Sequence, residues 1–147
     1  MLPFQEPIFE YHSHSLEETT KIAKQLSTKL KKGSCVAFFG ELGAGKTTFI
    51  KTLVKEINNT DENQISSPTF TYLNIYKGEI DINHFDLYRI KDKDQFISMG
   101  FDEYFDENSI CLIEWADKIT PILPSNTFII HIISLDENKR KIALMHL

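Results

Sequence analysis

Short runs of apolar residues along the chain predict the strands of a buried sheet. Cys35–Phe39 and Ile110–Ile113 are unbroken apolar runs of strand length, the pattern of strands that are covered on both faces. Ile8–His12 predicts a further short strand near the N-terminus. The sequence therefore indicates a sheet whose inner strands are enclosed by other elements.

Two longer segments place apolar residues at helical spacing. The first begins after Ser15, which forms a capping-box pattern with Glu18, and Gly33 is expected to cap its C-terminal end. Its apolar positions are Leu16, Ile22, Ala23, Leu26 and Leu30. The second is expected to follow a glycine-rich turn and to end near Asn58–Asn59, and Asp92–Met99 predicts a shorter third helix. One face of the second helix carries Phe49, Ile50, Leu53, Val54 and Ile57.

Two hairpins are expected in the second half of the chain. Phe70–Tyr76 and Ile80–Phe85 form the first, with Gly78 in its turn, after a polar loop over Thr60–Pro68. Ile80–Phe85 alternates between apolar and polar residues and so predicts a strand that is only half buried. The second hairpin is expected at the C-terminal end, where the turn is Asp136-Glu-Asn138 between Thr127–Ser134 and Lys141–His146.

Composition and charge narrow the class of protein. The 147 residues are 41% apolar and 25% charged, the balance of a folded chain with one core. The net charge of −5 argues against a protein whose main task is to hold a nucleic-acid backbone. There is no membrane-spanning apolar run, and Met1–Glu10 does not resemble a signal peptide, so a cytoplasmic protein is expected. Cys35 and Cys111 lie in apolar runs and are expected to be reduced core residues.

A glycine-rich motif predicts a phosphate site between the second strand and the second helix. The motif G-x-x-x-x-G-K-[ST] is matched by Gly40, Glu41, Leu42, Gly43, Ala44, Gly45, Lys46 and Thr47, and Thr48 follows. Glycines allow backbone N–H groups to close on phosphate oxygens, and the helix that follows points its positive end at the anion. Lys46 would reach the β- and γ-phosphates, and the Thr47 hydroxyl would ligate Mg²⁺. The order of elements around this motif predicts an α/β fold: a single P-loop NTPase domain over residues 1–147, with a mixed, partly parallel sheet flanked by helices.

A magnesium ion at this loop needs a carboxylate from the end of a strand. Glu114 follows the apolar run Ile110–Ile113, and Asp86 follows the alternating strand before it. Either acid can instead be a solvated strand end. The base is harder to assign, but Asn138-Lys139 lacks the acid of the Asn-Lys-x-Asp guanine reader, which favours ATP.

Several residues stay open between a functional and a structural role. Ser66–Phe70 is placed like a switch segment but is also an ordinary turn sequence. Trp115 suits the core or a partner contact, and His84 suits a structural or a supporting role beside Asp86. Lysines near the end of the first helix fit a solvated helix terminus better than an RNA contact; they are Lys24, Lys29, Lys31 and Lys32.

Five segments together resemble the TsaE family, small bacterial P-loop ATPases of the machinery that makes N6-threonylcarbamoyladenosine at position 37 of tRNAs. The segments are Phe39–Phe49, Ser67–Phe70, His84–Arg89, Met99–Phe105 and Cys111–Trp115. They follow the family's order over almost the whole chain. The glycine-rich motif is shared by many families, whereas His-Phe-Asp-Leu-Tyr-Arg and Ile-Glu-Trp are specific to this one.

The resemblance implies an Mg²⁺-dependent ATPase that is weak alone and stimulated in a complex. It implies docking on the heterodimer of the TsaD and TsaB subunits, where ATP hydrolysis supports repeated turnover of the TsaD transferase. Contact with tRNA would then be indirect, through the complex.

The resemblance also assigns roles to individual residues. It implies magnesium ligands at Thr47 and Glu114, and it places Asp86 near the γ-phosphate and the metal. Thr69 falls on the switch-like segment, so that Lys46, Thr69, Asp86 and Glu114 form the expected catalytic set. Thr19 resembles a helix threonine at the nucleotide, although Thr20 beside it leaves the register open. Arg140 resembles a basic residue on the base or ribose side.

Two other functions compete with this one. A small-molecule kinase on the same scaffold would need a lid with catalytic arginines, but Arg89 and Arg140 are the only arginines. A nucleotide-dependent interaction module would release no phosphate. Measurement of phosphate release with and without the partner heterodimer separates the three.

Overall fold

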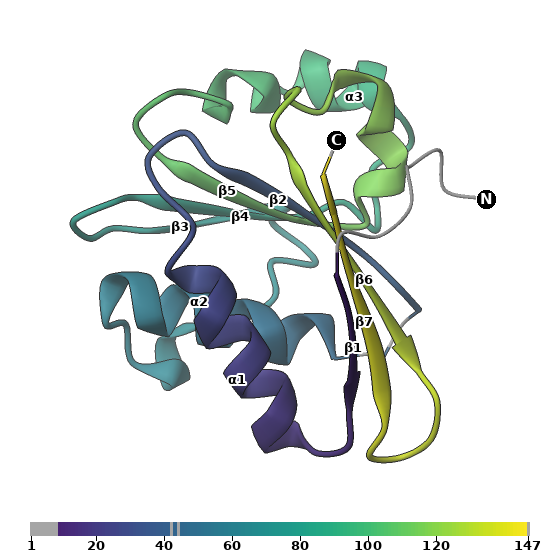
Figure 1. The fold of residues 1–147 in the computed structure, drawn as a ribbon. Helices are drawn as coiled ribbons and strands as arrows, with labels where there is room; N and C mark the ends of the chain where they lie inside the picture. Colours follow the sequence, from purple (N-terminus) through teal and green to yellow (C-terminus); the bar gives the residue numbers. More distant parts are fainter. Residues whose placement is uncertain (1–8, 42, 44, 147) are drawn as a thin grey trace.

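The protein folds into a seven-stranded sheet with helices on both faces (Figure 1). The structure is a computed structural model that describes residues 9–41, 43 and 45–146. The strands are β1 (Phe9–Ser13), β2 (Cys35–Phe39), β3 (Leu73–Tyr76), β4 (Ile82–Asp86), β5 (Ile110–Glu114), β6 (Phe128–Ser134) and β7 (Arg140–His146). The α-helices are α1 (Leu16–Ser27), α2 (Lys46–Asn58) and α3 (Lys93–Ser98), and the 3₁₀-helices are η1 (Glu62–Gln64), η2 (Phe101–Tyr104) and η3 (Ala116–Ile122).

The sheet is parallel at its centre and antiparallel at both edges. Its order is β1-β7-β6-β2-β5-β4-β3, in which β2 pairs in parallel with β5 and β6, and β5 pairs in parallel with β4. The outer pairs β1–β7, β6–β7 and β3–β4 are antiparallel. The predicted α/β class and the mixed, partly parallel sheet are confirmed.

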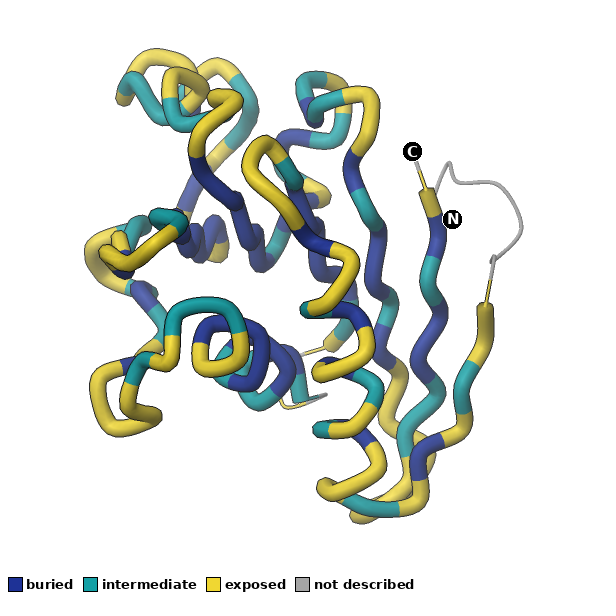
Figure 2. Tube along the Cα trace, turned by 60° about the vertical axis from the view of Figure 1, so that its left-hand side comes forward, coloured by how far each residue is buried: buried dark blue, intermediate teal, exposed yellow. Residues whose placement is uncertain are grey.

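Alternate residues of β2 face two separate cores. Val36 and Phe38 pack against α1 and α2, whereas Ala37 and Phe39 belong to the cluster that includes α3 and η3. Cys35 and Cys111 lie in this second cluster, both buried and both free thiols, so their predicted core position is confirmed. Figure 2 shows the inner strands buried along their length while the helices expose their outer sides.

The predicted helices are present, with one boundary that differs. Ser15 caps α1, since its Oγ accepts a hydrogen bond from the Glu18 N–H at 3.1 Å. The prediction that Gly33 caps this helix is wrong: α1 ends at Ser27, and Thr28 closes it in a right-handed conformation. Gly33, at φ 91°, instead turns the chain into β2, and its N–H donates to the Ser109 carbonyl at 2.9 Å. None of the helices in the described part of the chain has the length and apolarity needed to cross a bilayer.

Both predicted hairpins form, but the first differs in detail. Its first strand begins at Leu73 rather than Phe70, and β4 is buried at every position rather than half buried. Burial is complete because β4 lies between β3 and β5 within the sheet and both of its faces are covered. Gly78 does not have a positive φ; a β-carbon there would lie 2.4 Å from Asn58 Cγ, so close approach to α2 is what requires glycine.

Candidate functional site

The glycine-rich loop connects the end of β2 to the start of α2 in a conformation that favours glycine. Gly40, Gly43 and Gly45 have φ values of 149°, 80° and 104°. Gly45 is the N-cap of α2 and no side chain caps the helix, so its first-turn N–H groups face the loop. Leu42 and Ala44, which the motif also includes, lie outside the described residues. The loop thus supplies the backbone geometry that an anion at a helix N-terminus requires.

The side chain of Lys46 is held over this loop and is buried. The residue is 5% exposed, and its Nζ donates to the Gly40 carbonyl at 2.8 Å. The same Nζ lies 3.9 Å from the centroid of the Trp115 ring, a cation–π contact. Burial lowers the pKa of Lys46, and the nearby carboxylates of Glu114, Asp86 and Asp117 oppose that shift.

Trp115 reaches this position because the backbone turns sharply after β5. It has a φ of 57°, an unusual left-handed conformation for a residue with a large side chain. The turn ends the strand directly after Glu114 and begins η3 at Ala116. Trp115 is therefore neither fully buried nor remote: its indole lies against the lysine of the glycine loop.

The two predicted acids lie side by side at the carboxyl ends of their strands, which is also the end of β2 from which the glycine loop leaves. Asp86 ends β4 and Glu114 ends β5, and they are partners in the parallel register. Both are buried, at 4% and 3% exposure. Since β2 runs parallel to these strands, its glycine loop leaves the sheet at the same end at which the two acids lie. Neither acid is a solvated strand end.

The segment that follows η1 contacts these acids directly. The Ser67 Oγ lies 2.7 Å from Asp86 Oδ2 and 3.2 Å from Glu114 Oε2, and the Thr69 hydroxyl donates to Asp86 Oδ2 at 3.2 Å. The Tyr76 hydroxyl fixes the start of this segment, because it donates to the Ser66 carbonyl at 3.0 Å and accepts a hydrogen bond from the Ser66 N–H. Ser66–Phe70 is therefore joined to the acidic site, as a switch segment would be.

His84 supports Glu114 and not Asp86. Its Nε2 lies 2.8 Å from Glu114 Oε2, the ring is fully buried, and its Nδ1 has no hydrogen-bond partner among the described residues. The bond assigns the proton to Nε2, because an N–H on Nδ1 would be left unsatisfied. Sequence reasoning left His84 open and did not identify the Ser67 contact. Strand alternation was an available signal, since residues two apart lie on one face, as His84 and Asp86 do.

A pocket of about 220 Å³ lies against the glycine loop. Thr19 from α1, Thr48 from α2 and Arg140 from β7 line it together with Gly43 and Gly45. Thr20 is not among its lining residues, so the structure places Thr19 at the loop.

Side chains around this pocket are held in place. The Thr19 Oγ1 is 2.7 Å from Ser13 Oγ. Arg140 Nη1 donates to the Asp136 carbonyl at 2.7 Å, which fixes the guanidinium beside the turn between β6 and β7. The pocket is thus lined by residues from both ends of the chain, Thr19 and Arg140, which were both expected to contact the nucleotide.

Other predicted residues make fewer contacts. Thr47 is half-buried in the first turn of α2, and its hydroxyl makes no hydrogen bond within the described residues. Glu41 is exposed. The structure therefore brings two groups of predicted residues together. Lys46, Asp86, Glu114 and Thr69 form one group, and Thr19 and Arg140 line the pocket.

The oxygen donors of this site suit magnesium bound with a phosphate. Within residues 9–41, 43 and 45–146, no three His, Cys, Asp or Glu side chains gather to hold a metal ion alone. Two carboxylates and nearby hydroxyls are hard oxygen ligands, and Mg²⁺ commonly takes one or two carboxylates while phosphates and water complete its shell. The residues fit a metal that enters with a nucleotide.

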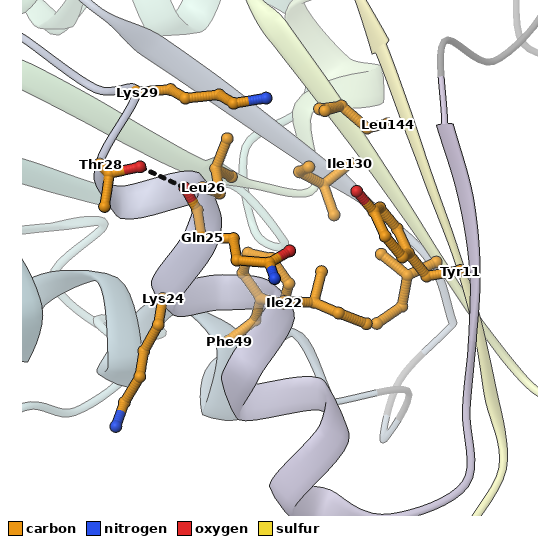
Figure 3. A pocket seen from close by; sticks show the side chains of 11 residues that line it. Tyr11, Ile22, Lys24, Gln25, Leu26, Thr28, Lys29, Phe49, Ile130 and Leu144 are labelled. Atoms are coloured by element: carbon orange, nitrogen blue, oxygen red, sulfur yellow. Dashed lines mark hydrogen bonds between the residues drawn. The ribbon is translucent and has the colours of Figure 1, made fainter.

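A larger hollow of about 470 Å³ has a different character (Figure 3). It lies between α1 and the sheet, and Ile22, Phe49 and Leu144 are among the apolar residues that line it. No carboxylate lines it, and Lys24 points away from it. Its mainly apolar lining offers no carboxylate that could hold a magnesium ion.

The fold and the site together define an α/β protein with a partly parallel sheet that is flanked by helices. A glycine loop joins an inner parallel strand to a helix, and acids from two neighbouring strands end beside it. The chain belongs to the TsaE family, whose model, described as "Threonylcarbamoyl adenosine biosynthesis protein TsaE", matches residues 13–142. This family acts in tRNA threonylcarbamoyladenosine biosynthesis.

Individual relatives agree with this assignment. The chain is 40% identical to the tRNA threonylcarbamoyladenosine biosynthesis protein TsaE of Rickettsia felis over 88% of its own length and 75% of that protein. It is 38% identical to the protein of the same name from Bacillus subtilis, over 86% of its own length and 78% of the relative. The crystal structure of YdiB from Bacillus subtilis superposes with a TM-score of 0.73 at 32% identity, covering 94% of this chain and 84% of that one.

Proposed function

We propose that this protein is the Mg²⁺-dependent ATPase subunit of the tRNA N6-threonylcarbamoyladenosine modification complex. It would act in the cytoplasm on the TsaD–TsaB heterodimer, whose repeated turnover ATP hydrolysis would support, and it would meet tRNA at position 37 only through that complex. One observation carries the proposal: two buried carboxylates, Asp86 and Glu114, stand in register beside the lysine of a glycine-rich loop.

Each part of the site has a task in this proposal. Backbone N–H groups of Gly40–Thr48 and the start of α2 would bind the phosphates, and Lys46 would leave the Gly40 carbonyl to reach the β- and γ-phosphates. Thr47 and Glu114 would hold Mg²⁺, which when bound would neutralise the charge that develops on the phosphates. Thr19, Thr48 and Arg140 would line the nucleotide's other side.

The acidic pair would position water and metal. Asp86 is fixed from both oxygens, because the Tyr88 N–H donates to Oδ1 at 3.0 Å while Ser67 and Thr69 contact Oδ2. A carboxylate held this way would orient water for in-line attack and accept its proton. Thr69 would move with the γ-phosphate, as switch residues do.

The arrangement of arginines supports weak activity of the chain alone. Arg89 lies against Phe70, with its Cζ 4.3 Å from the ring centroid, and Arg140 is bonded at the Asp136 turn. In this arrangement neither guanidinium contacts the acids, whereas phosphoryl transfer commonly uses an arginine at the γ-phosphate. We expect the partner to complete the site.

Calorimetry and phosphate release test the proposal together. The chain should bind Mg-ATP more tightly than Mg-GTP, and it should release phosphate without a small-molecule acceptor. A requirement for such an acceptor would instead identify a kinase. Nucleotide binding without any phosphate release, alone or with the heterodimer, would identify an interaction module and refute the ATPase assignment.

A further inference from the structure

Two aromatic side chains and an arginine are exposed next to the acidic site. Phe70 is 76% exposed and Tyr88 is 54% exposed, and the Arg89 guanidinium lies over the Phe70 ring at 4.3 Å. We refer to Phe70, Tyr88 and Arg89 as the Phe70 patch. Burial of large aromatic side chains is a main source of stability, and the fold leaves these two mostly in water.

The guanidinium N–H groups of Arg89 are available to bind a partner. Its Cζ lies over the Phe70 ring, and its N–H groups make no hydrogen bond within the described residues. A guanidinium in this position presents a planar fork that matches a carboxylate. Aromatic residues and arginine are also the types that dominate binding energy at protein interfaces.

Contacts join the Phe70 patch to the catalytic side of the loop by two routes. Thr69, adjacent to Phe70, donates to Asp86, and the Tyr88 N–H donates to the same carboxylate. In addition, the Tyr88 ring packs on Trp115 at 5.0 Å between centroids, and Trp115 contacts Lys46. A partner that binds the patch would therefore contact residues that position Asp86 and Lys46.

We propose that the Phe70 patch is the docking hot spot for a partner protein that offers an apolar recess for Phe70 and Tyr88 and a carboxylate for Arg89. Docking there would fix the switch segment against Asp86 and so link partner binding to nucleotide. The inference rests on the proposed function for the identity of the partner, the TsaD–TsaB heterodimer, and adds the face that meets it.

The charges favour a protein over RNA as the occupant. Arg89 is the single cation of the patch, and the side chains to which the patch connects include the Asp86 and Glu114 carboxylates. RNA affinity depends on neutralising several phosphates, and the chain carries a net charge of −5. A single arginine beside carboxylates suits one acidic side chain in an apolar surface.

Variants at the patch and a matched control test this inference. Phe70→Ala and Arg89→Ala should each weaken binding to the heterodimer by about tenfold or more, while Mg-ATP affinity of the chain alone stays within about twofold. Arg89→Lys should recover only part of the loss, because an ammonium lacks the fork. Phe9→Ala is the control: Phe9 is 45% exposed under Lys29 at 5.4 Å and lies on β1, at the opposite edge of the sheet.

The outcomes separate the inference from the proposed function. Normal heterodimer binding by Phe70→Ala and Arg89→Ala would overturn the docking face and leave the proposed function intact. Failure of the unaltered chain to bind the heterodimer with Mg-ATP would overturn the proposed function itself. Binding of a tRNA by the chain alone, lost in both variants, would replace the protein partner by RNA and also overturn the inference.

Discussion

Among single residues, Ser67 joins the segment Ser66–Phe70, the proposed switch segment, to both acids. Its hydroxyl has one proton and two carboxylate neighbours, so it can donate to only one of them at a time. The other carboxylate depends on Thr69, Tyr88 or His84 for its hydrogen bonds. These donors satisfy carboxylate oxygens that are buried in the fold, so the position of the segment and the position of the acidic pair depend on each other.

Replacement of Lys46 tests the phosphate side of this arrangement. Lys46→Ala removes a charge-assisted bond worth roughly 1.5–3 kcal/mol, so Mg-ATP affinity should fall about tenfold to a hundredfold in calorimetry. Because Lys46 is buried against Trp115, alanine should also lower the unfolding temperature. Lys46→Met keeps the apolar stem and should lose affinity with less loss of stability. Unchanged affinity in both variants would refute the phosphate role.

Replacement of the acids tests the catalytic side. Glu114→Gln and Asp86→Asn keep the side-chain shape and remove the charge, so phosphate release in the assembled complex should fall by about 10²-fold or more while ATP binding changes little. Asp102→Asn, at an exposed acid in η2, is the control and should hydrolyse normally. An acid whose amide variant hydrolyses ATP at the normal rate would have no role in catalysis.

At the scale of elements, the β3–β4 hairpin fixes both the switch segment and the end of α2. Tyr76 binds Ser66, and Asn58 at the end of α2 donates to the carbonyls of Tyr76 and Ile80 at 3.3 and 2.7 Å. The helix that begins at the glycine loop is thereby tied to the strand that ends at Asp86.

Gly78→Ala should loosen this connection. The new methyl group would overlap Asn58, which must move and give up its two hydrogen bonds, at a cost of about 1–3 kcal/mol in the free energy of unfolding. Urea unfolding of Gly78→Ala, Asn58→Ala and the double variant measures the coupling. The double variant should be little less stable than Asn58→Ala; additive losses would mean that the clash is not the cause.

Elements with a strong local pattern were predictable, and those fixed by tertiary contacts were not. The apolar runs of β2 and β5 and the capping box of α1 are local signals, and both acids follow from strand ends. The 3₁₀-helix η3 contains Pro121 and has no helical periodicity, so no pattern along the chain predicted it. Burial of Lys46 depends on the left-handed turn at Trp115, which a motif read along the chain does not reveal.

At the scale of the whole molecule, β2 separates two cores and carries the loop at its end. One core lies under α1 and α2 and the other under α3 and η3. Cys35 and Cys111 are register partners on β2 and β5 within the second core. Burial raises the pKa of Cys111 to about 12 and raises that of Cys35 as well.

These thiols give the fold a sensitivity to alkaline pH. Since their folded pKa values lie above the ordinary thiol value, their contribution to stability is complete below about pH 8.5 and is lost as the pH rises toward 12. The free energy of unfolding, measured with urea between pH 8 and pH 10.5, should therefore decline. Cys111→Ala should decline less steeply, whatever its stability at pH 8. An identical slope in the two proteins would contradict this prediction.

We propose that the acidic pair beside the glycine loop acts in ATP hydrolysis once partners complete the site. Steady-state phosphate release from Mg-ATP, measured for the purified chain alone and with the TsaD–TsaB heterodimer, tests it most directly. We expect slow release by the chain alone, a marked rise with the heterodimer, and tighter docking in the presence of Mg-ATP, since coupling between two ligands is reciprocal. A fast isolated enzyme that is indifferent to the heterodimer, and that docks equally well without nucleotide, would contradict it.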